Sequence, residues 1–105
     1  MGVLALPKTS KNDAIQRVAQ IADNTTGFVY FSEHCEMRML ERGISRKQIL
    51  RVLRSGELIG KVEWDIEEER GWKMKLKRIS AGAEIRVVAK LVERDSECVV
   101  AVTTF

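Results

Sequence analysis

The only histidine of the chain shares one helical arc with two arginines. His34, Arg38 and Arg42 recur at intervals of four residues, a spacing that places them on the same side of an α-helix. Neighbouring positive charge favours the neutral imidazole, which can accept a proton, and guanidinium groups bind phosphate oxygens in pairs. The arc therefore predicts a site that binds or cleaves a phosphodiester. The alternative is an exposed helix face whose arginines pair with nearby acids such as Glu41.

A second set of cations alternates with apolar residues along two stretches that we predict to be neighbouring strands. Its members are Lys73, Lys75 and Lys77 on the first stretch and Arg86, Lys90 and Arg94 on the second. Successive side chains of a strand point to opposite sides of a sheet. If the two polar faces coincide, the sheet has a basic side that suits a nucleic-acid backbone. An ordinary solvated face is the other interpretation. Stacking platforms would come from aromatic residues that we expect mostly in the core, namely Tyr30, Trp64, Trp72 and Phe105.

A third set of cations follows a tight corner between two predicted helices. Gly43 ends the first helix and Ser45 is placed to begin the second. The outward arc of that second helix carries Arg46, Lys47, Arg51 and Arg54. The pattern is similar to a helix-turn-helix. Any tight corner between helices needs the same residue types, so DNA reading through this segment is kept as an alternative.

Acidic residues gather in one predicted loop, at Glu63, Asp65, Glu67, Glu68 and Glu69. They lack the glycine-centred ladder of a calcium-binding EF-hand, and a solvated hairpin loop is the favoured interpretation. A loop this acidic beside basic faces can also screen them. The chain has one histidine and no pair of cysteines at ligand spacing, so we predict neither a metal site nor a cofactor.

The periodicity of apolar residues predicts the elements that must position these groups. Spacings of three and four residues predict helices over Asn12–Asp23, Glu33–Arg42 and Arg46–Ser55, and alternation predicts strands over Glu57–Trp64, Trp72–Ile79, Glu84–Arg94 and Glu97–Phe105. Residues 28–31 are either a brief strand or an extended lead-in. The order predicts an α+β fold, in which three N-terminal helices pack on one face of a four-stranded antiparallel meander.

Composition narrows the class of protein. The 105 residues suit a single domain, and the contents of 45% hydrophobic and 31% charged residues are those of a soluble globular chain. No apolar run is long enough to cross a membrane, and Met1–Ser10 lacks the features of a secretory signal. Two cysteines make no disulfide framework, so we expect a cytoplasmic protein. The net charge of +3 permits a polyanionic partner without requiring one.

Four short motifs resemble a bacterial family of domains of unknown function, DUF4258. They are Ser32-Glu33-His34-Cys35-Glu36-Met37-Arg38-Met39, Glu41-Arg42-Gly43-Ile44-Ser45, Gly56-Glu57-Leu58-Ile59 and Val99-Val100-Ala101-Val102-Thr103-Thr104-Phe105. We therefore expect a family-like region over residues 28–105. The predicted helix within residues 10–27 lies outside the pattern, and the loop after Trp64 is unusually acidic for it.

The resemblance implies kinship with RelE- and BrnT-type toxins of the barnase–EndoU–colicin–RelE superfamily. It implies a RelE/barnase-like fold, a metal-independent endoribonuclease, RNA as substrate and an antitoxin protein as partner. In such a site His34 would act as base or acid and Arg38 and Arg42 would hold the phosphate. Lys73, Lys75, or the hydroxyl of Tyr30 or Thr103, would supply the remaining role. The rival expectation is a non-catalytic module that binds a nucleic acid or a protein.

Overall fold

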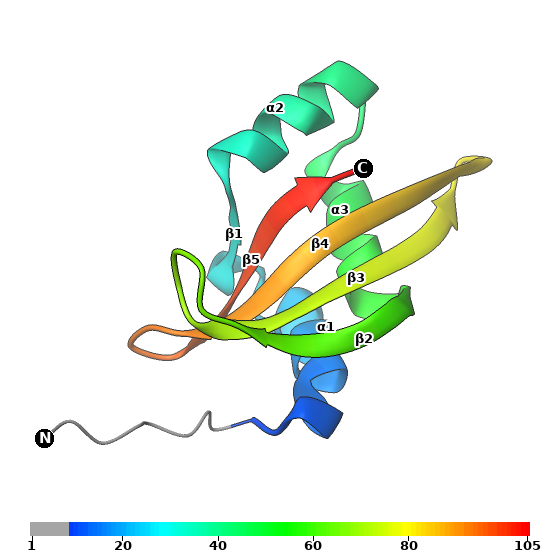
Figure 1. Ribbon diagram of the computed structural model, residues 1–105. Helices are drawn as coiled ribbons and strands as arrows, with labels where there is room; N and C mark the ends of the chain where they lie inside the picture. The colour runs from blue at the N-terminus through cyan, green and yellow to red at the C-terminus, as the bar shows by residue number, and fades with distance from the viewer. Residues whose placement is uncertain (1–8) are drawn as a thin grey trace, which may run out of the picture.

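The computed structural model describes residues 9–105, which form helices and one sheet (Figure 1). The helices are α1 (Ala14–Asn24), α2 (Glu33–Arg42) and α3 (Arg46–Ser55), with 3₁₀ turns at Lys11–Asp13 and Thr26–Phe28. The strands are β1 (Val29–Phe31), β2 (Glu57–Asp65), β3 (Gly71–Ser80), β4 (Ala83–Glu93) and β5 (Glu97–Thr104). The predicted α+β class is confirmed. Most of the segment assessed for a secretory signal, residues 1–8, lies outside the described residues.

Local side-chain chemistry sets the ends of α2 and α3 at the predicted residues. The Ser32 hydroxyl accepts a hydrogen bond from the Cys35 amide at the start of α2, and Gly43 ends that helix in the left-handed conformation, with φ 65°. Ser45 begins α3 with a reciprocal capping box, in which its hydroxyl and the Gln48 side chain each accept from the other residue's backbone amide. The two helices therefore meet at a fixed corner.

The sheet has five strands in the order β1-β5-β4-β3-β2. Strands β2 to β5 form the predicted antiparallel meander, and β5 lies between β4 and β1. The expectation of four strands is wrong, because β1 adds a fifth and pairs parallel to β5, with Tyr30 opposite Val100. The sheet is therefore mixed. Three residues are too few to show a period, so the sequence left this segment open between strand and lead-in.

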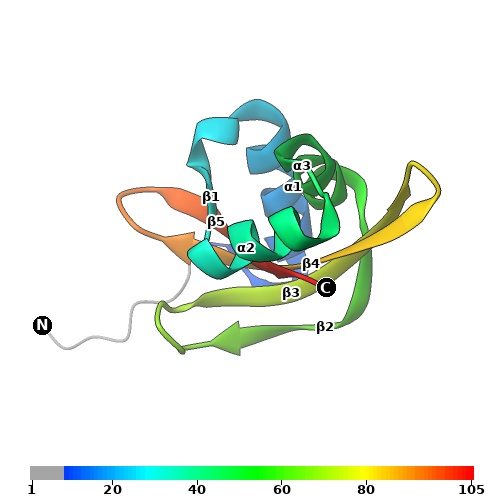
Figure 2. The same cartoon turned by 90° about the horizontal axis from the view of Figure 1, so that it is seen from above.

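The helices differ in how they cover the sheet. Helices α1 and α3 lie side by side behind the sheet, whereas α2 crosses the end of β5 (Figures 1 and 2). The expectation that three helices pack on one face is therefore met in part: α2 lies at the end of the sheet, but its Cys35 and Met39 belong to the same core. The core between α1, α3 and the sheet includes Val18, Ile21, Ile49, Met74 and Val87, all of them fully buried. Within residues 9–105 the structure holds no helix of the length and apolarity needed to cross a bilayer.

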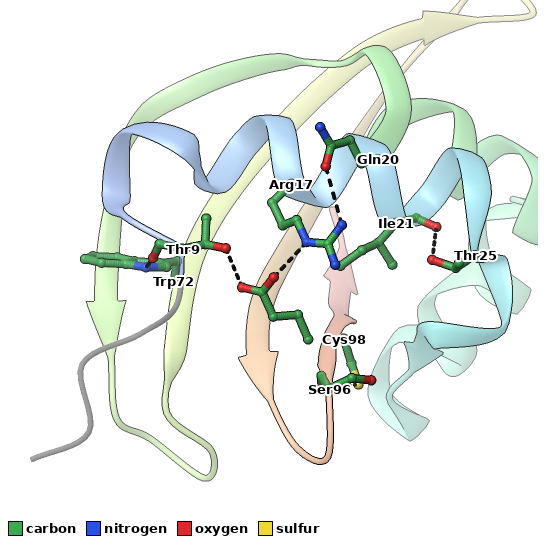
Figure 3. A network of polar contacts seen from close by, with 9 residues as sticks. Thr9, Arg17, Gln20, Ile21, Thr25, Trp72, Ser96 and Cys98 are labelled. Atoms are coloured by element: carbon green, nitrogen blue, oxygen red, sulfur yellow. Dashed lines mark hydrogen bonds and ion pairs between the residues drawn. The ribbon is translucent and has the colours of Figure 1, made fainter.

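Polar contacts join Thr9 and the start of α1 to strands β3 and β5 (Figure 3). The Trp72 indole donates to the Thr9 carbonyl oxygen over 2.8 Å, and Nε of Arg17 donates to the Glu97 carboxylate over 2.7 Å. The Thr9 hydroxyl also donates to Glu97. Together with the buried side chains of α1, these contacts join the helix that precedes the family-like motifs to the same core.

Strand register determines which side chains lie on the face of the sheet that α1 and α3 leave uncovered. Lys73 lies opposite Lys90 and Lys77 lies opposite Arg86 across β3 and β4, so the polar faces of the two strands coincide. Each side chain points away from α1 and α3, because its neighbours in the strand belong to the core. We call this surface the open face; it comprises the outward residues of β1 to β5, among them Tyr30, Lys73, Lys75, Lys77, Arg86, Val88, Lys90, Val100 and Thr103.

Candidate nucleic-acid interface

One end of the open face places two cations beside an aromatic ring. The Nζ of Lys75 lies 6.0 Å from the centroid of the Phe105 ring, and the guanidinium carbon of Arg86 lies 5.8 Å from it. A hydrogen bond of 3.0 Å from the Phe105 amide to the Arg86 carbonyl oxygen holds the backbone of Phe105 beside β4. Lys75 and Arg86 are exposed and Phe105 is half-buried. An aromatic ring with two cations over it combines the groups that bind a base and its phosphate.

Helix α2 brings Arg38 to the same end of the sheet. Nε of Arg38 donates to the Thr104 carbonyl oxygen over 3.4 Å, and its Nη1 pairs with Glu41 over 3.4 Å. His34, one turn earlier, and Arg42, one turn later, are both exposed. Of the three residues predicted on this arc, Arg38 is the one that the structure joins to β5 by a hydrogen bond.

The predicted cations of α3 lie on a different surface. Ile49, Val52 and Leu53 attach α3 to the helix-covered face of the sheet, so its exposed residues Lys47 and Arg51 point away from the open face. Arg46 is held at the corner by Glu36, at 3.1 Å, and by the Phe31 ring, at 4.9 Å. Helix α2 packs mainly on β5, which differs from the paired helices of a helix-turn-helix.

The two supporting residues lie on the open face. Tyr30 of β1 is 41% exposed, and its ring stacks under the Arg94 guanidinium at 4.9 Å. Thr103 lies opposite Val88, and its hydroxyl donates to the Thr104 carbonyl oxygen over 3.4 Å. Thr103 is therefore adjacent to the carbonyl that Arg38 contacts, whereas Tyr30 belongs to the opposite end of the open face.

That opposite end is covered by the acidic loop, residues 65–70. Nζ of Lys90 bonds to three loop oxygens, the Asp65 carboxylate at 2.9 Å and the carbonyls of Glu67 and Glu69 at 2.8 Å each. The hydrogen bond from Lys90 holds the pKa of the Asp65 carboxyl below its usual value, with help from the Glu67 amide. The predicted screening of basic residues by this loop is therefore realised at Lys90.

A pocket of about 420 Å³ lies under this loop. Its lining joins the loop acids to the sheet residues Lys73, Lys90 and Val100 and to Tyr30, Ser32 and Arg94. His34, Arg38 and Arg42 do not line it. The structure thus separates the hollow of the open face from the arc predicted to carry the chemistry.

Candidate metal ligands in residues 9–105 are dispersed, and both cysteines are buried. No group of three or more His, Cys, Asp or Glu side chains in this part of the chain is arranged to hold a metal ion. Both cysteines are buried and free. Burial, with a smaller effect of Glu36, raises the pKa of the Cys35 thiol to about 11, and burial also raises the pKa of Cys98.

Sequence reasoning misplaced one part of this surface and described a second only in general terms. Phe105 was considered for stacking but was expected, like most of the aromatic residues, in the core. The available signal for an exposed site was the alternation of Lys75 and Arg86 with apolar residues in their strands. The second part is the contact between the acidic loop and Lys90. It depends on the fold of an irregular segment, for which the sequence has no period.

Comparison with known proteins agrees with the four motifs. No curated protein and no solved structure matches the chain. A family model described as "Domain of unknown function (DUF4258)" matches residues 31–105, from the end of β1 to Phe105. The match includes α2, α3 and the whole antiparallel meander and leaves out α1. Because it spans well over half of the chain, the protein belongs to the DUF4258 family.

Proposed function

We propose that this protein binds single-stranded RNA along its open face. The observation that carries the proposal is the cluster at the end of β5, where Lys75 and Arg86 flank the Phe105 ring. Cations beside an aromatic ring bind both parts of a nucleotide, because the ring stacks on the base and the cations neutralise the phosphate. Arg38 adds a third cation at the Thr104 carbonyl.

The cross-strand environment of Lys75 supports this choice. Its partners are Val88 on β4 and Ile59 on β2, so neither adjacent strand places an acid directly opposite it. Lys73 and Lys77, by contrast, face Glu63 and Glu57 on β2. Lys75 is therefore the β3 lysine whose charge is least balanced by the sheet itself, and it is the one beside Phe105.

A matched pair of double variants tests the proposal. We expect Lys75→Gln with Arg86→Gln to weaken the binding of a fluorescent oligouridine strand about tenfold or more at low salt, measured by anisotropy in the presence of a chelator. Lys47→Gln with Arg51→Gln removes the same charge from α3, on the other side of the molecule, and should change the affinity by less than about threefold. Equal losses in the two double variants would show that the open face is not the RNA site, and no binding by the wild type would show that the native protein does not bind RNA.

Metal-independent cleavage of the bound RNA is the second candidate function. The observation that favours it is the position of His34 one turn before Arg38, on the helix that borders the basic end of the sheet. His34 would take the proton of a 2′-hydroxyl, whose oxygen attacks the phosphorus atom and displaces the 5′-oxygen as a cyclic phosphate forms. Arg38 would stabilise the charge on the phosphate, and Lys75 or Thr103 would protonate the leaving oxygen.

The cleavage proposal is tested on RNA free of ribosomes, with chelator present. We expect His34→Ala to abolish cleavage while the anisotropy assay shows RNA still bound, because binding rests on the sheet cations. Cleavage that survives in this variant would show that His34 is not the catalytic base, and a wild type that binds RNA without cutting it would leave the protein as a binding module. Kinship with RelE-type toxins, cytoplasmic location and an antitoxin partner belong to the same proposal; such a partner would have to cover Lys75 and Arg86.

A further inference from the structure

Lys90 is a cation of the open face that the protein itself has covered. It lies opposite Lys73 on β3 and Val100 on β5, in the middle of the sheet, yet it is only 7% exposed. Its ammonium group is surrounded by the three loop oxygens described above, from Asp65, Glu67 and Glu69. Three oxygens around one ammonium are also what a phosphate group can offer.

Arg94 is bound by the same loop in the geometry of an anion site. Its Nε and Nη2 donate to the two carboxylate oxygens of Glu69, each over 2.8 Å. This parallel pair of hydrogen bonds is the arrangement by which arginine recognises both carboxylates and phosphates. The guanidinium also lies 4.9 Å over the Tyr30 ring, so an aromatic face adjoins the anion site, as Phe105 does at the other end of the open face.

Little besides these charges holds the loop in place. Ile66, its one large apolar side chain, is 69% exposed, and Glu67 and Glu68 are exposed as well. Glu68 adopts the left-handed conformation, with φ 61°, which is unfavourable for a residue with a side chain. A loop that buries no large apolar side chain and contains one strained residue can leave the surface when another anion replaces its oxygens.

We propose that the acidic loop occupies a second phosphate-binding subsite, formed by Lys90 and Arg94 beside Tyr30, and that a nucleic-acid strand must displace it. The inference rests on the proposed function, because the subsite extends the same basic face through Lys73. The pocket of about 420 Å³ beneath the loop marks the space into which the strand enters. The loop is tethered at both ends, so it competes at a high local concentration and lowers the apparent affinity for RNA.

Neutralising one loop acid tests the inference against a matched control. Glu69→Gln weakens the contact with Arg94 while keeping the side-chain length and one oxygen. Glu57→Gln removes the same charge from the open face opposite Lys77, far from the loop. With the oligouridine probe at pH 7, we expect Glu69→Gln to raise affinity about three- to tenfold and Glu57→Gln to raise it by less than about twofold. Equal gains would mean that the loop acts only through net charge and would overturn the subsite.

A second substitution identifies the cation that is uncovered. Adding Arg94→Gln to the Glu69→Gln variant should remove the gain, because the freed guanidinium is what binds the phosphate. If the double variant keeps the gain, Arg94 is not part of the subsite and the inference is wrong. Circular dichroism and thermal unfolding of each variant separate a loss of binding from a loss of fold.

These outcomes separate the inference from the function on which it rests. RNA binding that depends on Lys75 and Arg86, with no difference between Glu69→Gln and Glu57→Gln, leaves the proposed function standing and overturns the covered subsite. Binding that appears only in Glu69→Gln supports the subsite, because the loop then blocks the wild type. No binding by any variant overturns both.

Discussion

Arg38 donates a hydrogen bond to the backbone carbonyl oxygen of Thr104, which joins the middle of α2 to the end of β5. Arg42, on the same arc of the helix, has no such contact with the sheet in residues 9–105. The two arginines were equivalent in the sequence, where only their spacing could be seen. In the structure Arg38 contacts the residue next to Phe105, so the two arginines should differ in their effect on RNA binding.

Arg38→Gln and Arg42→Gln should therefore have unequal effects on RNA binding. We expect Arg38→Gln to weaken binding about tenfold, or ~1.4 kcal/mol, and to lower the slope of log affinity against log salt by about 1. Arg42→Gln removes the same charge one turn further on and should cost less than about threefold. Anisotropy titrations at several salt concentrations measure both quantities. Similar effects of the two variants would show that the helix acts only through its total charge.

The ion pair between Glu69 and Arg94 predicts a pH-dependent contribution to stability. The hydrogen bonds from Arg94 hold the pKa of the Glu69 carboxyl below its usual value. A carboxyl with a lowered pKa in the folded state stabilises that state above its ordinary pKa, and the stabilisation is lost as the pH falls through the lowered value. Glu69→Gln should lower the free energy of unfolding at pH 7 by less than about 1 kcal/mol, because the pair is partly exposed.

Urea unfolding at several pH values measures this contribution. The difference between the wild type and Glu69→Gln should shrink as the solution is acidified below the usual carboxyl range, since both chains then carry an uncharged group at residue 69. A difference that stays constant down to strong acid would mean that residue 69 acts through packing or loop conformation and not through its charge.

Both thiols should be unreactive in the folded protein. The raised pKa of Cys35, about 11, leaves a thiolate fraction about a hundredfold below that of an ordinary thiol at pH 8, and both side chains are buried. We expect an aromatic disulfide reagent to modify Cys35 and Cys98 only as fast as the protein unfolds. Rapid modification of one thiol, in a protein that keeps its native circular dichroism, would show that the corresponding region opens locally.

Gly56 should tolerate substitution poorly although its backbone is extended, with φ −73°. A Cβ added there would lie 2.4 Å from the Val52 carbonyl oxygen and 3.1 Å from that of Lys77, so the corner between α3 and β2 would have to move. We expect Gly56→Ala to lower the free energy of unfolding by about 1–3 kcal/mol. Gly27→Ala, where no atom lies within 4 Å of the added carbon, should stay within about 0.5 kcal/mol of the wild type. Thermal unfolding compares the two.

The sequence predicted those parts of the fold that are encoded locally. Ser32, Gly43 and Ser45 mark the ends of helices through contacts with residues close in sequence. The alternation of lysines with Trp72, Met74 and Leu76 assigns the two kinds of residue to opposite faces of β3. The parallel pairing of β1 and the crossing of α2 over β5 depend on residues far apart in the chain, for which periodicity carries no information.

The difference between local patterns and long-range contacts also explains which features of the site could be predicted. The lysines of β3 could be assigned to one face, because that requires only their spacing. Which lysine of β3 or β4 keeps a charge with no acidic group beside it depends on partners in other strands and loops. Lys75 faces Val88 and Ile59, whereas Lys90 is neutralised by a loop that begins at Asp65. The separation of the α3 cations from those of the sheet likewise required the packing of α3.

The pairing of β1 with β5 has a consequence for the order in which the elements can assemble. Among residues 9–105, β1 pairs only with β5, which lies far along the chain and places Val100 opposite Tyr30, and α2 packs on that same strand. Contacts between such distant residues slow folding. A chain that lacks residues 97–104 would leave one edge of β4 unpaired and α2 without the strand on which it packs, so β1 and α2 can reach their native positions only once β5 is available.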